Sequence, residues 1–239
     1  MQRPGGFTLV ELMVTVAIAA ILLSLGLTSF NTVMASNKAK LTAESLFSGL
    51  RQARAAAIAR NVPMRFQTVT TMDNNCAYSA TSSLWVVTQT DAAPTMTGLA
   101  QGYCGAGPFT PPDRPSICTP DVPRCSSTVK TGCRGYFVDN NSSPASCSQD
   151  PLIAFKSDGN AQVGINVVAQ GGGTAAYAIT FSPLGRVITN AQSENPIDTI
   201  TVSSTNPSAN AWRIRIIPTS GAIRLCNPAA AAGAALACP

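Results

Sequence analysis

A single carboxylate, Glu11, interrupts the long apolar run at residues 7–30. An ionised carboxylate inside an apolar helix of membrane-spanning length is costly and normally has a partner of opposite charge. The small residues Gly5 and Gly6 stand directly before this run, whereas an ordinary secretory signal carries its small-residue cleavage site after the apolar core. Cleavage after Gly6 would leave the apolar helix on the mature chain and place a new α-amine on Phe7, one helical turn from Glu11.

Two roles for Glu11 follow from that placement. In a stack of such helices, its carboxylate would neutralise the α-amine of a neighbouring subunit and fix the axial register of the two chains. In the alternative interpretation, residues 7–30 form a simple signal anchor, and Glu11 lies near the lipid headgroups, where charges near helix ends cost less.

The chain has eight cysteines, all beyond the apolar run, and none of them forms a C-x-x-C pair. An even number of cysteines without metal-ligand spacing favours disulfides in an oxidising compartment. Eight cysteines allow 105 connectivities. Position suggests only one pair, Cys226 with Cys238, which bracket an alanine-rich loop. The pairing of the others is left open: Cys76, Cys104, Cys118, Cys125, Cys133 and Cys147.

Three arginines near the C-terminus form the third candidate group. Trp212–Ile217 alternates apolar and basic residues, and a turn centred on residues 219–220 leads into a second strand. This register predicts that Arg215 faces Arg224 and that both share the outer face with Arg213. Like charges opposed across strands destabilise a sheet, so the arrangement favours an anion, either a phosphate backbone or a carboxylate on another subunit. A solvated basic face is the alternative.

The composition argues against catalysis. The chain contains 16 Lys and Arg, 11 Asp and Glu and no His, which gives a net charge of +5. Histidine is the usual general base near neutral pH and the commonest metal ligand. We therefore expect no enzyme activity, no metal and no cofactor. The excess of positive charge is also too small to mark a dedicated nucleic-acid-binding domain.

One long helix is expected to position the N-terminal residues. Residues 1–6 form a short basic leader, residues 7–30 suffice to cross a bilayer, and residues 31–62 continue as an amphipathic helix that Pro63 ends. A break near Gly26 or Asn31 remains open. The residues expected to form the apolar face of the second half are Ala43, Leu46, Phe47, Leu50, Ala53, Ala57 and Ile58.

Residues 63–239 predict a β-rich head. Short segments rich in Val, Ile, Thr and aromatic residues alternate with Gly-containing turns, which favours antiparallel sheet packed on the helix, an α+β fold. The expected strands before the final hairpin are Met64–Thr70, Leu84–Thr90, Leu152–Lys156, Gln162–Ala169, Ala175–Phe181, Val187–Thr189 and Thr199–Ser203. Residues 91–150 form a Cys- and Pro-rich excursion, either a partner-facing surface or a tolerated insertion.

The cysteines also decide the topology. Lys and Arg flank the apolar run on both sides, so the positive-inside rule does not orient it. Disulfides in the head require an oxidising environment. We therefore expect a single-pass inner-membrane protein with its leader in the cytoplasm and its head in the periplasm.

The stretch from Gly6 to Glu11, GFTLVE, resembles the class III leader site of type IV pilins and pseudopilins. In that family a prepilin peptidase cuts after the glycine and methylates the new N-terminal residue. The resemblance implies cleavage between Gly6 and Phe7, an N-methylated Phe7, and a Glu11 that sets the register of assembly.

Three further stretches resemble the FimT/GspH type of minor pilin. They are the pattern Leu-x-x-Ala-Arg-x-x-Ala at residues 50–57, the turn at residues 181–186, and the C-terminal ending closed by Cys226 and Cys238. The resemblance is poor across residues 91–150. It implies a head of two sheets and a low-abundance subunit.

The expected function is a minor pilin that primes assembly of a type IV pilus or forms its tip, and that becomes extracellular in the assembled pilus. Its expected partners are prepilin peptidase, other major and minor pilins and the inner membrane. A pseudopilin of type II secretion is one alternative, and a DNA-binding minor pilin for natural transformation is another. Some FimT-type proteins bind DNA through Gly-Arg-x-Arg, but residues 221–224 read Gly-Ala-Ile-Arg here and lack the first arginine.

Overall fold

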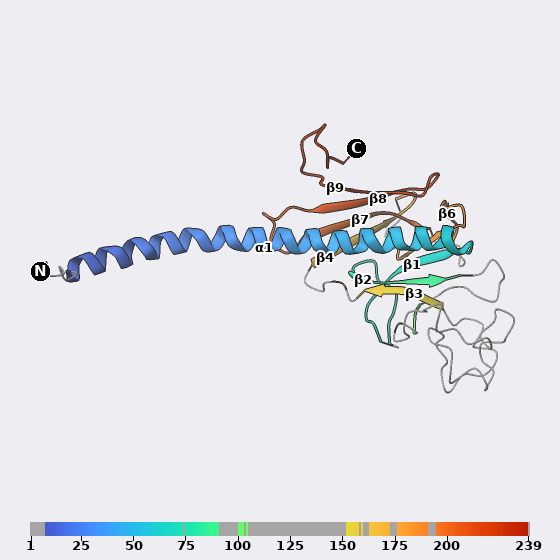
Figure 1. The fold of residues 1–239 in the computed structure, drawn as a ribbon, viewed down its shortest axis with the longest axis horizontal. Coiled ribbons are helices and arrows are strands. Elements are labelled where there is room, and N and C mark those ends of the chain that lie inside the picture. The colour runs from blue at the N-terminus through green and yellow to red at the C-terminus, as the bar shows by residue number, and fades with distance from the viewer. Residues whose placement is uncertain are drawn as a thin grey trace, which may run out of the picture.

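A computed structural model of the chain shows a long helix and a head built from two sheets (Figure 1). The described residues are 8–73, 75–90, 100–102, 104, 152–157, 159, 163–172, 176–190 and 195–238, without the side chains of residues 22–29 and 152. The leader, Phe7 and most of the excursion at 91–150 therefore lie outside the described residues, and so do the expectations that fall on them.

Helix α1 runs without a break from Leu9 to Arg60, over 52 residues. At about 1.5 Å per residue it is about 78 Å long. It continues through residues 26 and 31, where the sequence had left a break open. Asn61 ends it in the left-handed conformation, with φ 54°, and Pro63 follows. The N-terminal half of the helix projects beyond the head (Figure 1).

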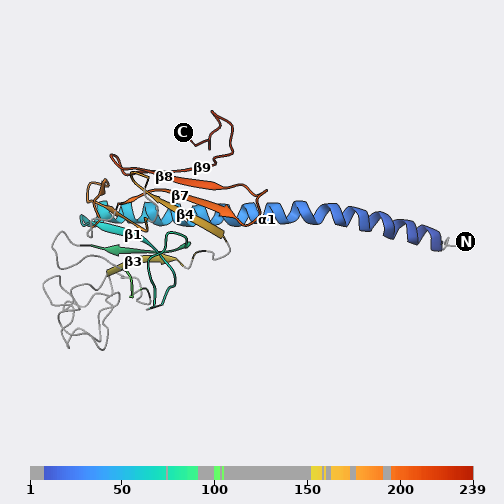
Figure 2. The same ribbon diagram turned by 180° about the vertical axis from the view of Figure 1, so that it is seen from behind.

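The C-terminal half of α1 packs along the junction of the two sheets, one on each side of it (Figure 2). Leu46, Leu50 and Ala53 are fully buried there. Ile58 departs from the apolar face that the sequence predicted, because it is 51% exposed. At about 100° per residue it lies about 80° away from Leu50, whereas Ala57 lies only about 20° away and is buried.

The first sheet has the strand order β3-β2-β1-β5-β6 and the second has the order β4-β7-β8-β9, and all neighbouring strands are antiparallel. The strands of the first sheet are β1 Met64–Val69, β2 Leu84–Gln89, β3 Leu152–Ser157, β5 Ala178–Phe181 and β6 Val187–Ile188. Those of the second are β4 Val163–Ala169, β7 Ile197–Ser204, β8 Trp212–Ile217 and β9 Ala222–Cys226. The expected α+β fold is confirmed, and the head has the two sheets that the resemblance implied.

The two sheets differ in how they are covered. Every residue of β1 is buried, because α1 packs on one face of the first sheet and a second apolar cluster, which includes Cys76, Ala100 and Cys104, packs with residues of its other face. In β8, by contrast, buried residues alternate with more exposed ones. The second sheet therefore has one face in the core and one open outer face.

Candidate functional site

The first turn of α1 holds Glu11 in a defined position. Thr8 is the N-cap, with an extended backbone, and its Oγ1 accepts a hydrogen bond from the Glu11 backbone N–H at 3.3 Å. Thr8 and Glu11 stand three residues apart, which is the spacing of a capping box. A carboxylate in the first turn also suits the positive end of the helix dipole. The T-x-x-E spacing of Thr8 and Glu11 in the sequence is the local signal for this capping role.

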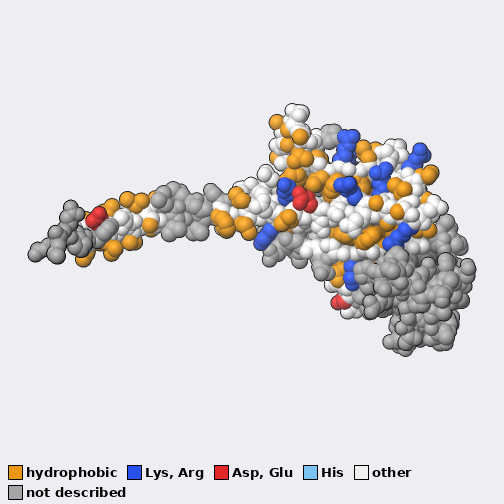
Figure 3. Space-filling model, in the orientation of Figure 1, with side chains coloured by type: hydrophobic (Ala, Val, Ile, Leu, Met, Phe, Trp, Pro, Cys, Tyr) orange, Lys and Arg blue, Asp and Glu red, His pale blue; other side chains and the backbone are white. Residues whose placement is uncertain are grey.

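The helix around Glu11 is apolar and exposed on all its sides. Leu12, Met13 and Val14 follow one another around the axis and are 58%, 64% and 52% exposed, and Figure 3 shows apolar side chains along the projecting end. A helix that is hydrophobic all round is normally covered by a membrane or by other apolar helices. Among the residues whose side chains are described, no helix is long and apolar enough to cross a membrane. The predicted span at 7–30 extends over residues 7 and 22–29, which lie outside that set.

The outer face of the second sheet brings the predicted arginines together with polar residues of other strands. In one cross-strand row, Arg213 pairs with Thr201 on one side and with Cys226 on the other. In the next row, Arg215 lies between Thr199 and Arg224. The pairing of Arg215 with Arg224 is the register that the hairpin sequence predicted.

A cavity of about 370 Å³ opens on this face. It is lined by Asn166, Val168, Asp198, Thr199, Thr201, Arg213, Arg215, Cys226 and Cys238. Arg224 is exposed and is not among the lining residues, so only two of the three predicted arginines meet in the cavity. The sequence indicated none of its β4 and β7 residues, because their place depends on a strand order that links segments distant in the sequence.

Asp198 reaches this face because of a β-bulge. Val168 pairs with Thr199 and Ala169 pairs with Ile197, so Asp198 is the extra residue of β7, and a bulge re-aims a side chain in this way. The Thr199 hydroxyl donates a hydrogen bond to Asp198 Oδ2 at 2.8 Å. Within the described residues neither cavity arginine forms an ion pair with Asp198, and Arg213 Nε is buried without a hydrogen-bond partner.

Two disulfides lie among the described residues. Cys226 is bonded to Cys238 beside the cavity, and Cys76 is bonded to Cys104 under the first sheet. The Cys76–Cys104 disulfide ties the beginning of the excursion at 91–150 to the head. The remaining cysteines, at positions 118, 125, 133 and 147, lie outside the described residues.

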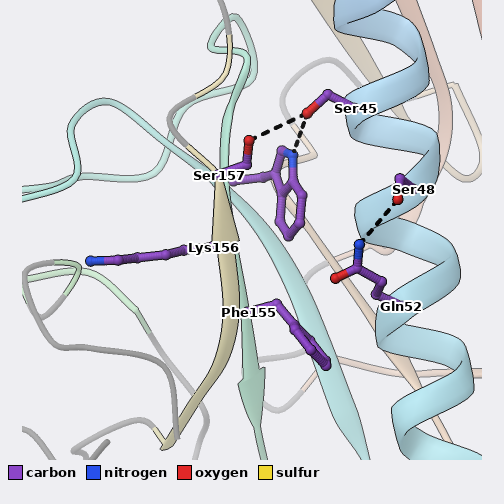
Figure 4. A pocket seen from close by; sticks show the side chains of 7 residues that line it. Ser45, Ser48, Gln52, Phe155, Lys156 and Ser157 are labelled. Atoms are coloured by element: carbon purple, nitrogen blue, oxygen red, sulfur yellow. Dashed lines mark hydrogen bonds between the residues drawn. The ribbon is translucent and has the colours of Figure 1, made fainter.

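A second cavity, of about 390 Å³, separates α1 from β3 (Figure 4). Its polar groups bond to one another: Trp85 Nε1 donates to Ser45 Oγ at 3.2 Å, and Gln52 Nε2 donates to Ser48 Oγ at 3.0 Å. Lys156 lines the same cavity, but its Nζ donates to the carbonyl of Cys104. Among these described lining residues, no hydrogen bond drawn in Figure 4 joins a serine hydroxyl to a side chain that could act as its general base.

In the described head, the Asp73 carboxyl has a shifted pKa that hydrogen bonds within its own turn explain. The Thr71 hydroxyl donates to Asp73 Oδ1 at 2.8 Å and the Asn75 backbone N–H donates to the same atom at 2.9 Å. These bonds, the hydroxyl first, lower the pKa of the exposed Asp73 carboxyl. Within the described residues, no group of three Cys, Asp or Glu side chains could hold a metal ion.

The N-terminal segment of the chain matches a known sequence motif. Residues 1–27 match the family model described as the prokaryotic N-terminal methylation motif. The chain thus carries a class III prepilin leader, and helix α1 of the α+β fold begins within the matched segment. No curated protein sequence matches the chain.

The solved structures that match the chain include two proteins of low sequence identity. The type IV minor pilin FimU of Pseudomonas aeruginosa is 14% identical, with a TM-score of 0.36, over 78% of this chain and 90% of FimU. The minor pseudopilin EpsH of the Vibrio cholerae type 2 secretion system is 13% identical, with a TM-score of 0.38, over 81% of this chain and 99% of EpsH. Similarity at this level assigns no role to individual residues.

Proposed function

We propose that this protein is a minor pilin of a type IV pilus system, a structural subunit that primes assembly or forms the tip of the filament. The observation that carries this proposal is the methylation motif at residues 1–27. It overlaps the start of one unbroken 52-residue helix, whose described N-terminal side chains are mostly apolar and exposed. Such a helix needs a membrane before assembly and other apolar helices after it.

Residues 7–30 are the proposed membrane-spanning segment, with the leader in the cytoplasm and the head in the periplasm. The disulfides in the head support this orientation, since the periplasm is oxidising and the cytosol is not. Residues 31–62 and 63–239 then serve as the amphipathic continuation of the helix and as the globular head.

Glu11 is the proposed assembly residue. Its carboxylate lies in the first turn of α1, next to the N-cap, so a chain that begins at Phe7 carries its α-amine close by. Within one subunit the two groups balance each other locally. Between subunits, the Glu11 carboxylate of one chain would pair with the α-amine of the next and so fix the axial position of one helix against its neighbour. An unpaired charge among apolar helices is costly.

Processing is the direct test of this proposal. The expected mature protein, extracted from membranes, begins at Phe7 and has the intact mass of that chain plus one methyl group, and Gly6→Leu keeps the leader attached. N-terminal sequencing and intact mass measure both outcomes. A mature chain that retains Met1, or that begins beyond residue 27, would exclude the prepilin function. A pseudopilin is processed in the same way, so loss of pilus formation against loss of secretion in a deletion strain separates these two roles.

A further inference from the structure

The cavity on the outer face of the second sheet has the groups of a site for one oxyanion. Arg213 and Arg215 of β8 provide guanidinium donors, Thr201 of the neighbouring strand β7 provides a hydroxyl, and Asn166 of β4, the strand beyond it, provides an amide. Cross-strand pairing places three of these residues in one row, since Asn166 pairs with Thr201 and Thr201 pairs with Arg213. Arg215 lies in the next row, opposite Thr199. A rigid frame of donors of this kind is what recognition of a carboxylate or phosphate group requires.

Arg213 Nε is the donor in this frame that the described protein groups leave unpaired. This nitrogen is buried and has no hydrogen-bond partner in the described structure. Buried donors in folded proteins are almost always paired, and an unpaired one needs an explanation such as a missing ion. An anion seated between the two arginines would accept from it.

The charges of the cavity select the kind of anion. Two arginines and Asp198 give the lining residues a formal charge of +1, the sum of +2 and −1. One singly charged group neutralises this site. A duplex, by contrast, presents one negative charge per about 1.7 Å of its axis, which would bring several phosphates against Asp198.

The wall of the cavity continues into an apolar surface. Cys226 and Cys238 line the cavity, and the loop between them, residues 227–237, is rich in exposed alanines and exposes 49% of Leu236. A charged recess beside small apolar side chains suits a short protein segment with one acidic residue. A free inorganic ion would not use the apolar part.

We infer that this cavity, here named the Arg213–Arg215 cavity, binds the carboxylate of an aspartate or glutamate on a neighbouring protein subunit. That the neighbour is another subunit of the filament rests on the proposed function, whereas the carboxylate chemistry does not. Failure of processing at Gly6 and failure of anion binding are therefore separate results.

Matched peptides test the inference on the full-length protein in detergent micelles. The probe is acetyl-Ala-Glu-Ala-amide, the control is acetyl-Ala-Gln-Ala-amide at equal ionic strength, and the readout is the NMR signal of the arginine Nε–H groups. We expect the glutamate peptide to shift the Arg213 and Arg215 signals and to saturate them with a dissociation constant on the order of 1 mM. The glutamine peptide should leave both signals in place.

Variants separate the cavity from a general basic surface. Arg213→Gln should weaken binding by about tenfold, since a hydrogen bond to a charged group is lost. Thr201→Val keeps the shape of the side chain and should weaken binding by about threefold. Asp198→Asn should strengthen binding, because it removes the like charge. The exposed Arg224→Gln and Arg186→Gln are the controls and should change it less than about twofold.

Three outcomes would overturn the inference. Equal shifts with the glutamate and glutamine peptides would mean that the carboxylate is not recognised. An Arg224→Gln effect as large as that of Arg213→Gln, together with binding of a 12-base-pair duplex, would identify a nucleic-acid surface instead. Saturation by inorganic phosphate but not by the glutamate peptide would identify a small-anion site. Asp198→Asn keeps the test valid if Arg213→Gln fails to fold.

Discussion

A junction between two turns holds the second sheet against the helix, and Gly221→Ala tests it. Gly221 precedes β9 with φ 64°, and a Cβ added there would overlap the carbonyl oxygen of Gly185. Arg54 of α1 spans the same junction, because its Nε donates to Gly185 O at 2.9 Å and its Nη2 donates to Ser220 O at 3.1 Å. Any added atom must separate the turns and break these bonds.

The expected loss of stability has two parts. Holding an alanine in the left-handed conformation costs about 1–2 kcal/mol. The two hydrogen bonds of the partly exposed Arg54 contribute about 1 kcal/mol each, which is below the range for fully buried charged donors. Gly221→Ala should therefore lower the free energy of unfolding by about 3–4 kcal/mol.

Gly171→Ala is the matched control. Gly171 has φ 83°, but a Cβ there would meet nothing within 4 Å, so only the backbone cost of about 1–2 kcal/mol applies. Urea unfolding in detergent measures both, with the fluorescence of the buried Trp85 and Trp212 as the signal. Because Gly221→Ala already breaks the Arg54 bonds, adding Arg54→Ala should cost much less than Arg54→Ala does alone. Equal losses for Gly221→Ala and Gly171→Ala would refute the close approach of the two turns.

Two further predictions concern the ends of the molecule. Glu11→Ala should leave cleavage and membrane insertion intact but should strongly reduce the amount of this protein in sheared filaments, as measured by immunoblotting of filament and membrane fractions. The control Thr8→Ala removes only the helix cap, at a cost of about 1 kcal/mol. An equal assembly defect in Thr8→Ala would assign the effect to capping rather than to charge. Replacing Cys226 and Cys238 together by serine opens a loop between residues 12 apart in the sequence. It should lower the free energy of unfolding, measured with urea, by about 3 kcal/mol. An unchanged unfolding midpoint would mean that the disulfide does not stabilise the head.

Local patterns in the sequence were sufficient for the helix and for the last hairpin. The apolar spacing from Ala43 to Ala57 and the stop at Pro63 predict the C-terminal half of α1, because both depend only on nearby residues. The register of β8 and β9 follows from alternation and a short turn, with Arg215 opposite Arg224 as expected. In such hairpins the turn length fixes the pairing.

Features that depend on the pairing of strands far apart in the sequence could not be predicted from local patterns. Strand β1 pairs with β5, which lies more than 100 residues further along the chain, and no local signal indicates that partner. The same holds for Arg65, a fully buried arginine in β1 whose Nε donates to Thr180 Oγ1 of β5 at 3.1 Å. The Arg213–Arg215 cavity belongs to this group too, because two of its donors come from β4 and β7.

The contacts between α1 and the second sheet constrain where a partner can reach the cavity. Asn210 N donates to Ser36 Oγ at 3.2 Å, and Lys40 Nζ lies 5.8 Å from the centre of the Trp212 ring. Arg54 fixes the opposite end of the β8–β9 hairpin. The inner face of this sheet is thus bound to the helix along its length, and the outer face, with the cavity, is turned away from it. If the helices of a filament pack together at its centre, the carboxylate that enters this cavity must come from a head that lies beside or outside this one.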